Sequence, residues 1–331
     1  MMNQIHNLYI VHSPLQILSA IEAKENFSLK NNVLVIVRNK FKKNNDLMNN
    51  ILKYGTWDQI LELNYDKNSK FRNNLKLINR LKKHEYKYIF TGNIGNTNEA
   101  IISNLKNEDI YLIDDGTSTL TYHKTKDHTK VKSKFSIRKM RYNLFFLKCA
   151  PVENVKYFTL FNIDSNKNEI IVKNKFNYLR NNFLNRVKKS TNKVFIIGQS
   201  IAKGYITEDL YIKYIKQIIQ DNKDEEIVYY PHRYEDTEKL SSTIKNKNFI
   251  VKKVDLPIEL ELLEQEYYPK KIISFFSAAL FTLNKLFDKT EVNSYVIEYD
   301  KVLINLDTVK TCYDELKSEN VNLIYLNTNK E

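Results

Sequence analysis

Short apolar runs rich in β-branched and aromatic residues alternate with longer helical patterns along most of this chain. The runs in the first half lie at residues 7–11, 32–37, 57–63, 86–90, 108–113 and 157–163. Those in the second half lie at residues 193–197, 226–230, 249–251, 271–273 and 294–299. Strands of a parallel sheet are buried on both faces by the helices that connect them, so they read as continuous apolar runs. The pattern therefore predicts an α/β fold built on parallel sheets.

The alternating pattern is interrupted once and then starts again, which indicates two domains. A polar stretch at residues 188–192 lies between an expected helix at 176–189 and the strand at 193–197. With 331 residues, the chain is also longer than one ordinary core requires. We therefore expect an N-terminal domain at 1–188 and a C-terminal domain at 189–331, each a doubly wound, Rossmann-like unit.

The net charge and the cysteine content indicate which classes of ligand the protein binds. The formal net charge is +13, and a basic surface attracts anions such as nucleotide sugars, acidic glycans, lipid head groups or nucleic acid. The chain is also rich in Lys, Asn and Ile, so part of the basic excess reflects a compositional bias. Two cysteines, Cys149 and Cys312, form neither a disulfide framework nor a metal-binding spacing, which suits a reducing compartment. We expect no metal site.

No segment has the pattern of a signal peptide or a membrane-spanning helix. Residues 3–9 are polar and lead into a strand, and the longest apolar run, residues 272–283, is shorter than the ~20 residues that span a bilayer. These features predict a soluble protein. A basic stretch at 122–148 ends in the apolar residues 144–147. It fits an anionic membrane surface, and equally a solvated insertion followed by a core helix.

A histidine follows one of the expected strands of the second half. The strand at 226–230 stops at Pro231, which cannot donate a hydrogen bond to a sheet, and His232 and Arg233 come next. In open α/β sheets, ligands bind beyond the carboxyl ends of the strands, so this position favours a functional histidine. A turn histidine in front of a solvated helix start is the alternative.

Three other strand ends carry turn-forming or polar residues: Asp114-Asp115-Gly116, Gly198-Gln199 and Ser277. When two carboxylates are adjacent, one can contact a substrate while the other hydrogen-bonds locally, and the glycine permits a tight turn. Ser277 at a helix N-terminus offers a hydroxyl and backbone N–H groups to an anion. A surface turn at residues 114–116 and plain N-capping by Ser277 are the alternatives.

Together, the four strand ends fit transfer of a group from a nucleotide-activated donor. A carboxylate removes a proton from an acceptor hydroxyl, while a histidine and a helix N-terminus stabilise a departing phosphate. The chain contains no Walker-type glycine loop and no Gly-x-Gly-x-x-Gly, which argues against ATPases and dinucleotide enzymes. It also lacks the Gly-x-Ser-x-Gly elbow of serine hydrolases. A glycosyltransferase is the class that these residues favour.

These residues resemble the motifs of bacterial sialyltransferases, in particular the lipooligosaccharide sialyltransferase family and its polysialyltransferase relatives. The acidic-acidic-Gly motif matches Asp114-Asp115-Gly116, the His-Pro motif region matches Tyr230-Pro231-His232, and the serine motif matches Ser277. Supporting matches follow the same order along the chain: Ser13-Pro14-Leu15-Gln16, Gly198-Gln199 and Leu256-Pro257-Ile258-Glu259. Their order over nearly the whole chain is more specific than any single motif.

The resemblance implies two Rossmann-like domains facing each other across a cleft in the GT-B arrangement. It also implies a CMP-sialic acid donor on the C-terminal domain, an acceptor on the N-terminal domain, inversion at the anomeric carbon and no metal requirement. Asp115 is then the candidate general base, His232 the general acid or phosphate binder, and Ser277 a phosphate ligand. The remaining candidates are Gly198, Gln199, Pro231, Arg233 and Ala278 for donor binding, with Asp114, Gly116, Ser13 and Asp209 as further site residues.

Three departures from the family pattern leave alternatives open. Arg233 stands where the His-Pro motif has its proline, and Ala278 stands where a second serine or threonine is common. Some relatives take the base from an acid shortly after the Gly-Gln turn. Here the first acids after that turn are Glu208 and Asp209, so the base is either Asp115 or one of these. The transferred sugar is sialic acid or a related nonulosonic acid of the pseudaminic or legionaminic type.

The expected reaction is sialylation of a bacterial surface-glycan or glycolipid precursor in lipopolysaccharide or capsule synthesis. We expect it in the cytoplasm, at the inner face of the membrane, without a nucleic-acid partner. One alternative is a transferase or epimerase that uses another nucleotide sugar, because a two-domain fold does not distinguish nucleotides. The other is a non-catalytic basic module that binds membranes or nucleic acid, although the chain has no recognisable nucleic-acid motif.

Overall fold

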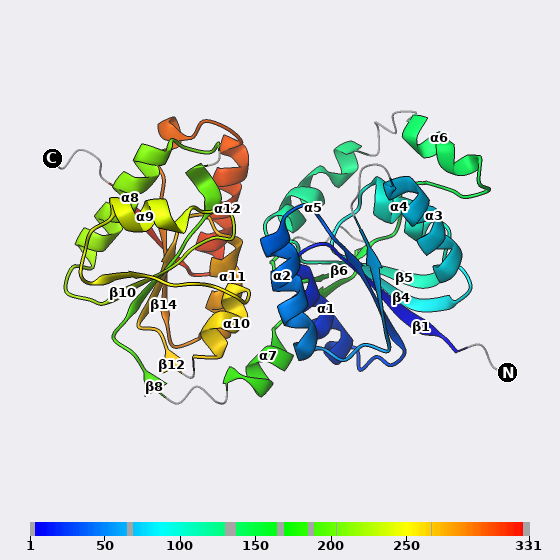
Figure 1. Cartoon of the computed structure of the whole chain (residues 1–331), viewed down its shortest axis with the longest axis horizontal. Helices are drawn as coiled ribbons and strands as arrows, with labels where there is room; N and C mark the ends of the chain where they lie inside the picture. Colours follow the sequence, from blue (N-terminus) through cyan, green and yellow to red (C-terminus); the bar gives the residue numbers. More distant parts are fainter. Residues whose placement is uncertain are drawn as a thin grey trace. The chain divides into compact units, whose positions relative to one another are not determined.

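The structure, a computed structural model, divides the chain into two compact units, Met1–Tyr178 and Leu179–Glu331 (Figure 1). It describes residues 4–64, 69–129, 137–163, 169–184, 189–202, 204–265 and 267–326. The domain boundary expected at 188/189 falls next to residues 185–188, which lie outside the described part of the chain.

The N-terminal unit is a doubly wound α/β domain. Its strands are β1 (His6–Val11), β2 (Asn32–Val37), β3 (Gln59–Leu63), β4 (Glu85–Thr91), β5 (Lys106–Ile113), β6 (Lys156–Thr159) and β7 (Ile171–Lys173). Its helices are α1 (Pro14–Asn26), α2 (Lys42–Ile51), α3 (Lys70–Leu81), α4 (Asn96–Ile102), α5 (Ser118–Thr129) and α6 (Ile137–Asn143), and α7 (Asn177–Asn182) spans the boundary between the units. Among the described residues, seven parallel strands form one sheet in the order β3-β2-β1-β4-β5-β6-β7.

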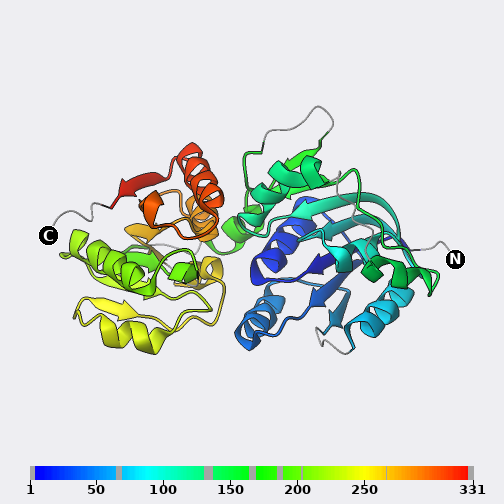
Figure 2. The ribbon, with the colours of Figure 1, turned by 90° about the horizontal axis from the view of Figure 1, so that it is seen from above.

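Both faces of this sheet are buried. On one face, Leu8 and Ile10 of β1 belong to a core that includes Leu77 of α3, Ile101 of α4 and Tyr142 of α6. Helices α1 and α2 cover the other face (Figures 1 and 2). Because consecutive residues of a strand point to opposite faces, a strand between two helical layers is apolar at every position. This explains the continuous apolar runs of the sequence.

The C-terminal unit repeats the same architecture. Its main strands are β9 (Val194–Ile197), β10 (Ile227–Tyr230), β11 (Phe249–Val251), β13 (Lys271–Ser274), β14 (Glu291–Val296) and β15 (Asn322–Tyr325). Its helices are α8 (Glu208–Asp221), α9 (Thr237–Thr243), α10 (Ile258–Leu263), α11 (Ala278–Leu286) and α12 (Leu306–Ser318). Counted over the described residues, six parallel strands have the order β11-β10-β9-β13-β14-β15, and a small parallel pair joins β8 (Lys189–Ser190) to β12 (Tyr267–Tyr268).

The two strand orders are equivalent. In each unit the first strand lies in the middle, the next two extend the sheet to one side and the later ones to the other, as in dinucleotide-binding domains. The prediction of two Rossmann-like domains is therefore confirmed. The order reverses between β1 and β4 in one unit and between β9 and β13 in the other, and ligands of such sheets bind beyond the carboxyl ends at that point.

Three expected elements have other bounds in the structure. The strand expected at 294–299 is β14 at Glu291–Val296. The helix expected at 176–189 is the short α7, because the chain is again extended in β8. The core helix considered at the end of the basic stretch forms only in part, as α6 (Ile137–Asn143), which contributes Tyr142 to the core. There α6 ends at Asn143, and Leu144, Phe145 and Phe146 are exposed. Residues 130–136 of that stretch lie outside the described residues.

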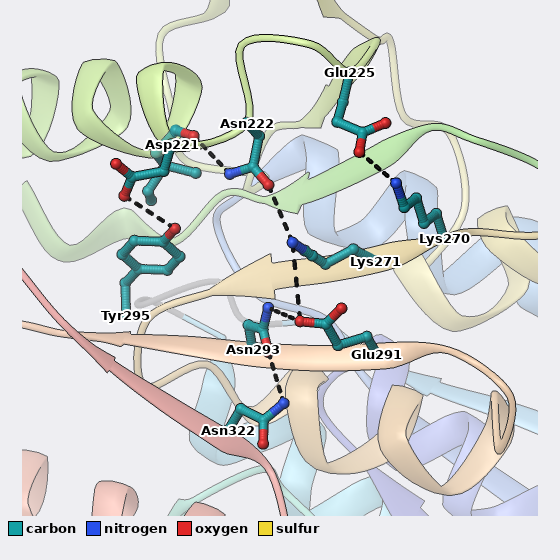
Figure 3. A network of polar contacts seen from close by, with 10 residues as sticks. Asp221, Asn222, Glu225, Lys270, Lys271, Glu291, Asn293, Tyr295 and Asn322 are labelled. Atoms are coloured by element: carbon teal, nitrogen blue, oxygen red, sulfur yellow. Dashed lines mark hydrogen bonds and ion pairs between the residues drawn. The ribbon is translucent and has the colours of Figure 1, made fainter.

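A polar network lies at the amino-terminal edge of the C-terminal sheet (Figure 3). Lys271, the first residue of β13, lies 3.3 Å from Asn222 Oδ1 and 3.8 Å from the Glu291 carboxylate at the start of β14. The buried Asn293 donates to Glu291 Oε1 (2.7 Å), and its own oxygen accepts from the Asn322 amide (3.1 Å). The network thus joins β13, β14 and β15 at the edge opposite to their carboxyl ends.

Asn293→Ala should weaken this edge, because both partners of a buried amide lose their hydrogen bond. We expect the free energy of local opening of β14 to fall by about 1–3 kcal/mol. Native-state hydrogen exchange of the β14 amides measures it. The matched control is Asn192→Ala at an exposed position, which should leave protection unchanged. Equal protection in both variants would show that the network does not stabilise the sheet.

Candidate functional site

In the N-terminal unit, residues that follow β1 and β5 meet at the carboxyl-terminal edge of the sheet. Ser13 caps α1, and its hydroxyl donates a hydrogen bond to Asp115 Oδ1 (3.2 Å) across 102 positions of sequence. The Asp115 N–H donates to Thr119 Oγ1 (3.0 Å) at the start of α5. Asp115 is partly exposed. The structure thus brings two of the predicted site residues together.

The neighbouring carboxylate, Asp114, lies in the interior. It accepts hydrogen bonds from the Thr159 hydroxyl and from the Leu160 N–H (2.8 Å). Burial raises the pKa of Asp114 to about 7, and the two hydrogen bonds oppose the shift. Gly116 follows with φ +61°, a left-handed conformation that favours glycine. This turn keeps one carboxylate inside and presents the next at the edge.

His12 belongs to the same edge, although the sequence motif that begins at Ser13 does not include it. Its Nε2 lies 3.0 Å from Asn98 Oδ1. The Asn98 amide nitrogen donates to Thr91 Oγ1 and to the Asn93 carbonyl, so Oδ1 acts as an acceptor and His12 Nε2 as the donor. Burial lowers the pKa of His12, against the effect of the Asp115 carboxylate. The contact with Asn98 Oδ1 thus requires a proton on Nε2, and the position of His12 directly after β1 was the signal in the sequence.

In the C-terminal unit, Glu235 organises the loop that contains His232. Its Oε1 accepts from the hydroxyls of Tyr229 (2.6 Å) and Tyr211 (2.8 Å), and its Oε2 accepts from the His232 N–H (2.5 Å). Burial raises the pKa of both tyrosines, so they remain donors. The His232 Nδ1 accepts from the Tyr234 N–H (3.3 Å). Glu235 therefore fixes the backbone of the histidine turn, a role for which the only signal in the sequence was its closeness to His232.

Gly198 is required by the same packing. A Cβ at this position would overlap the Glu235 carboxylate and would lie 2.6 Å from the Tyr229 hydroxyl and 2.9 Å from the His232 nitrogen. The Gly198 N–H donates to the Tyr230 carbonyl (2.7 Å). The turns after β9 and β10 are thus in direct contact, and only glycine fits between them.

A cavity of about 260 Å³ lies beside these two turns. Its lining includes Gln199, Ser200, Tyr211, Tyr234, Glu235 and Lys239. The Gln199 Oε1 and Ser200 Oγ atoms are buried and have no hydrogen-bond partner among the described residues. Buried polar atoms normally find a partner, so these two are available to a ligand.

Ser277 and Ala278 lie at the end of the adjoining strand β13. Ser277 is the N-cap of α11, and its hydroxyl accepts from the Ala279 N–H (3.3 Å). Ala278 is the first residue of that nine-residue helix. Gly198 and Ser277 follow β9 and β13, the strands between which the order reverses. Both therefore lie where a doubly wound sheet binds its ligand.

The remaining predicted residues differ in their surroundings. Pro231 is buried, and Arg233 is partly buried with its guanidinium 5.1 Å from the Tyr234 ring centre. Asp209 lies exposed in the first turn of α8, beside Glu208. It lines a different surface hollow, with Lys213, Lys216 and Lys239.

The described residues contain no group of three or more His, Cys, Asp or Glu side chains arranged to hold a metal ion. Within the same residues, no helix combines the length and apolar character that a bilayer span requires. Metal independence and the cellular location stay predictions.

Solved structures of sugar-nucleotide epimerases share this two-domain fold. The chain is similar to a structure assigned as a UDP-N-acetylglucosamine 2-epimerase from Listeria monocytogenes, with TM-score 0.51 and 10% identity over 96% of this chain and 90% of that one. It is also similar to the Methanocaldococcus jannaschii UDP-GlcNAc 2-epimerase, with TM-score 0.50 and 13% identity over 98% and 90% of the two chains. Such low identities establish the fold alone.

The chain belongs to the alpha-2,8-polysialyltransferase family, whose model matches residues 7–296. This confirms the resemblance read from the motifs, and it makes the protein a glycosyltransferase of the sialyltransferase type. A non-catalytic basic module does not fit this membership. No curated protein sequence matches the chain.

Asp114→Asn should alter the pH dependence of stability. In the fold, the carboxyl pKa rises from 3.8 to about 7. Its contribution to stability is therefore complete below about pH 4 and is lost as the pH rises through about 7. Asparagine resembles the protonated acid and does not titrate. The melting temperature of Asp114→Asn should exceed that of the wild type at about pH 8, and the difference should shrink toward about pH 4.

The control for this prediction is Asp46→Asn, which changes an exposed carboxylate of α2. Its melting temperature should differ from that of the wild type by a similar amount at every pH. An Asp114→Asn variant that behaved like the control would contradict the burial argument.

Gly198→Ala should destabilise the C-terminal unit, because the new methyl group meets backbone and a fixed carboxylate. We expect a loss of about 1–3 kcal/mol in the free energy of unfolding, measured by urea denaturation. Gly95→Ala is the comparison, because a Cβ there has its nearest neighbour at 3.8 Å. A Gly198→Ala variant no less stable than Gly95→Ala would count against the tight contact between the two turns.

Proposed function

We propose that the protein transfers sialic acid, or a related nonulosonic acid, from a CMP-activated donor to a hydroxyl of a bacterial surface-glycan or glycolipid acceptor. The transfer inverts the configuration at the anomeric carbon. The observation that carries the proposal is the family match, because residues 7–296 include Asp115, His232 and Ser277. Their placement at carboxyl ends of strands supports it, since ligands of such sheets bind there.

Asp115 is the proposed general base. The acceptor oxygen bonds to the anomeric carbon on one face of the sugar, while the bond from that carbon to the phosphate oxygen breaks on the other. The acceptor proton passes to the Asp115 carboxylate, which the Ser13 hydroxyl holds in place. The alternative base, Glu208 or Asp209, lies in the first turn of α8. We favour Asp115 because this hydrogen bond orients its carboxylate.

The donor phosphate is proposed to bind at Ser277, His232 and Arg233. The N-terminus of α11 presents backbone N–H groups and the positive end of a helix dipole to an anion. His232 donates a proton or a hydrogen bond to the departing phosphate, and Arg233 adds a permanent positive charge. These groups neutralise the leaving group, so we propose that no metal is required.

The cytosine base is proposed to occupy the cavity beside Gln199. Its exocyclic amino group is a donor, which suits the buried Gln199 Oε1 and Ser200 Oγ atoms. We place the reaction in the bacterial cytoplasm at the inner face of the membrane, in lipopolysaccharide or capsule synthesis, because a nucleotide-activated donor and a lipid-linked acceptor meet there.

Asp115→Ala and His232→Ala should each lower turnover by ~10²–10⁴-fold, since each removes a proton-transfer or charge-stabilising group. CMP release from CMP-sialic acid, with a panel of galactosides as acceptors, measures turnover. Asp46→Asn is the control and should retain activity, and melting temperatures should show that all variants are folded. Wild-type turnover by a folded Asp115→Ala variant would refute the base assignment.

The melting temperature of the wild type with added nucleotides tests the proposed donor. A ligand that binds only the folded state stabilises it by mass action, so CMP should raise the melting temperature while UDP and GDP should not. Stabilisation by UDP without an effect of CMP would favour the alternative of a transferase or epimerase that uses another nucleotide sugar.

A further inference from the structure

An apolar turn projects from the N-terminal unit directly after α6. Its residues Leu144, Phe145 and Phe146 are 80%, 52% and 97% exposed, and Met140 of α6 is also exposed. A contiguous group of exposed apolar side chains is unusual on a soluble domain and marks an interaction site. The reaction chemistry proposed above uses none of these residues. We call residues 144–146, together with Met140, the apolar turn.

The apolar turn is held by the core beneath it. The N–H groups of Phe145 and Leu147 donate to the Tyr142 carbonyl at 2.9 Å and 3.1 Å, and Tyr142 and Leu147 are buried. The Tyr142 hydroxyl in turn accepts from the Asn74 amide of α3 (3.0 Å). Phe146 has φ +55°, a backbone conformation that is costly for a bulky residue. The fold therefore fixes Phe146 toward solvent in spite of this strain.

A cation lies beside the apolar turn, in a stretch of sequence without acidic residues. The Arg141 guanidinium lies 4.1 Å from the ring centre of Phe71, and that ring packs edge-on against Phe145 at 5.6 Å. Helices α3 and α6 pack in the same core and lie side by side in both views (Figures 1 and 2). The sequence of residues 70–83 and 137–148 contains no Asp or Glu. Its basic residues are Lys70, Arg72, Lys76, Arg80, Lys82, Lys83, Arg138, Lys139, Arg141 and Lys148.

We propose that the apolar turn and its basic surroundings dock on an anionic lipid bilayer. Leu144 and Phe146 then lie at the boundary between head groups and acyl chains, and the exposed cations Arg141 of α6 and Arg72, Lys76 and Arg80 of α3 supply positive charge for anionic head groups. A protein partner fits less well, because a stable interface needs about 20–30 residues on each side and the apolar turn is a single projecting loop. This inference deepens the proposed function, and it rests on that function only for the choice of membrane.

The test is co-sedimentation of the purified protein with vesicles of phosphatidylcholine, with and without phosphatidylglycerol. The wild type should bind the anionic vesicles, and added salt should weaken the binding. The double variant Leu144→Ser/Phe146→Ser should lower the partition coefficient at least about tenfold, because it removes the inserted apolar side chains. The control is Leu303→Ser/Ile304→Ser, a pair of exposed apolar residues in the other unit, which should bind as the wild type does.

Several outcomes would overturn the proposal. They are absence of wild-type binding to anionic vesicles, equal binding by the double variant, and equal loss in the control. Self-association of the wild type that disappears in the double variant, without vesicle binding, would assign the apolar turn to a protein contact instead. No sugar donor is present in this assay, so it gives the same answer if the proposed transferase activity is wrong. Unchanged melting temperatures would show that the variants are folded.

Discussion

The burial of parallel strands on both faces is the constraint on which the rest of this structure depends. In the described residues of both main sheets, the strands run in one direction, so their carboxyl ends gather along a single edge. Helices cover the faces, and the edge is left for polar groups. Residues far apart in sequence, such as Ser13 and Asp115, then become neighbours without any local signal that pairs them. The same rule brings the turns after β9 and β10 into contact in the second unit.

In each unit, a carboxylate with a structural role positions a residue that is proposed for chemistry. Asp114 positions Asp115, and Glu235 positions His232. Asp114 is enclosed by Thr159 and Leu160, so the turn through Gly116 has little freedom to present Asp115 differently. Glu235 accepts from two buried tyrosine hydroxyls and a backbone N–H, which anchors the turn at His232. A carboxylate with several donors is costly to displace. Preorganisation of this kind reduces the reorganisation needed during transfer.

Much of the fold was predictable because its signals are local. The apolar run at 32–37 coincides with β2, and Thr207 and Ser277 cap the helices that follow them. The prediction missed features that depend on tertiary contacts. Helix α2 is largely polar, with Leu47, Met48 and Ile51 as its only apolar residues, so its composition does not mark it as a packed element. The hydrogen bonds of Glu235 need two tyrosines from other elements, and no spacing rule predicts them. Composition left open whether residues 144–147 pack in the core or face a membrane, and in the structure Leu147 is buried while Leu144, Phe145 and Phe146 are exposed.

The two departures from the family pattern in the C-terminal unit both change the groups that are offered to an anion. Ala278 removes a neutral hydroxyl donor from the first turn of α11, while Arg233 adds a permanent charge directly after His232. The Tyr234 ring stacks near the guanidinium, and the Arg233 Nε atom is buried without a partner among the described residues. On the proposed function, binding of the phosphate thus shifts from hydroxyl donors toward a positive charge. A charge attracts any nucleotide phosphate equally, so discrimination between donors falls to the cavity at Gln199 and Ser200.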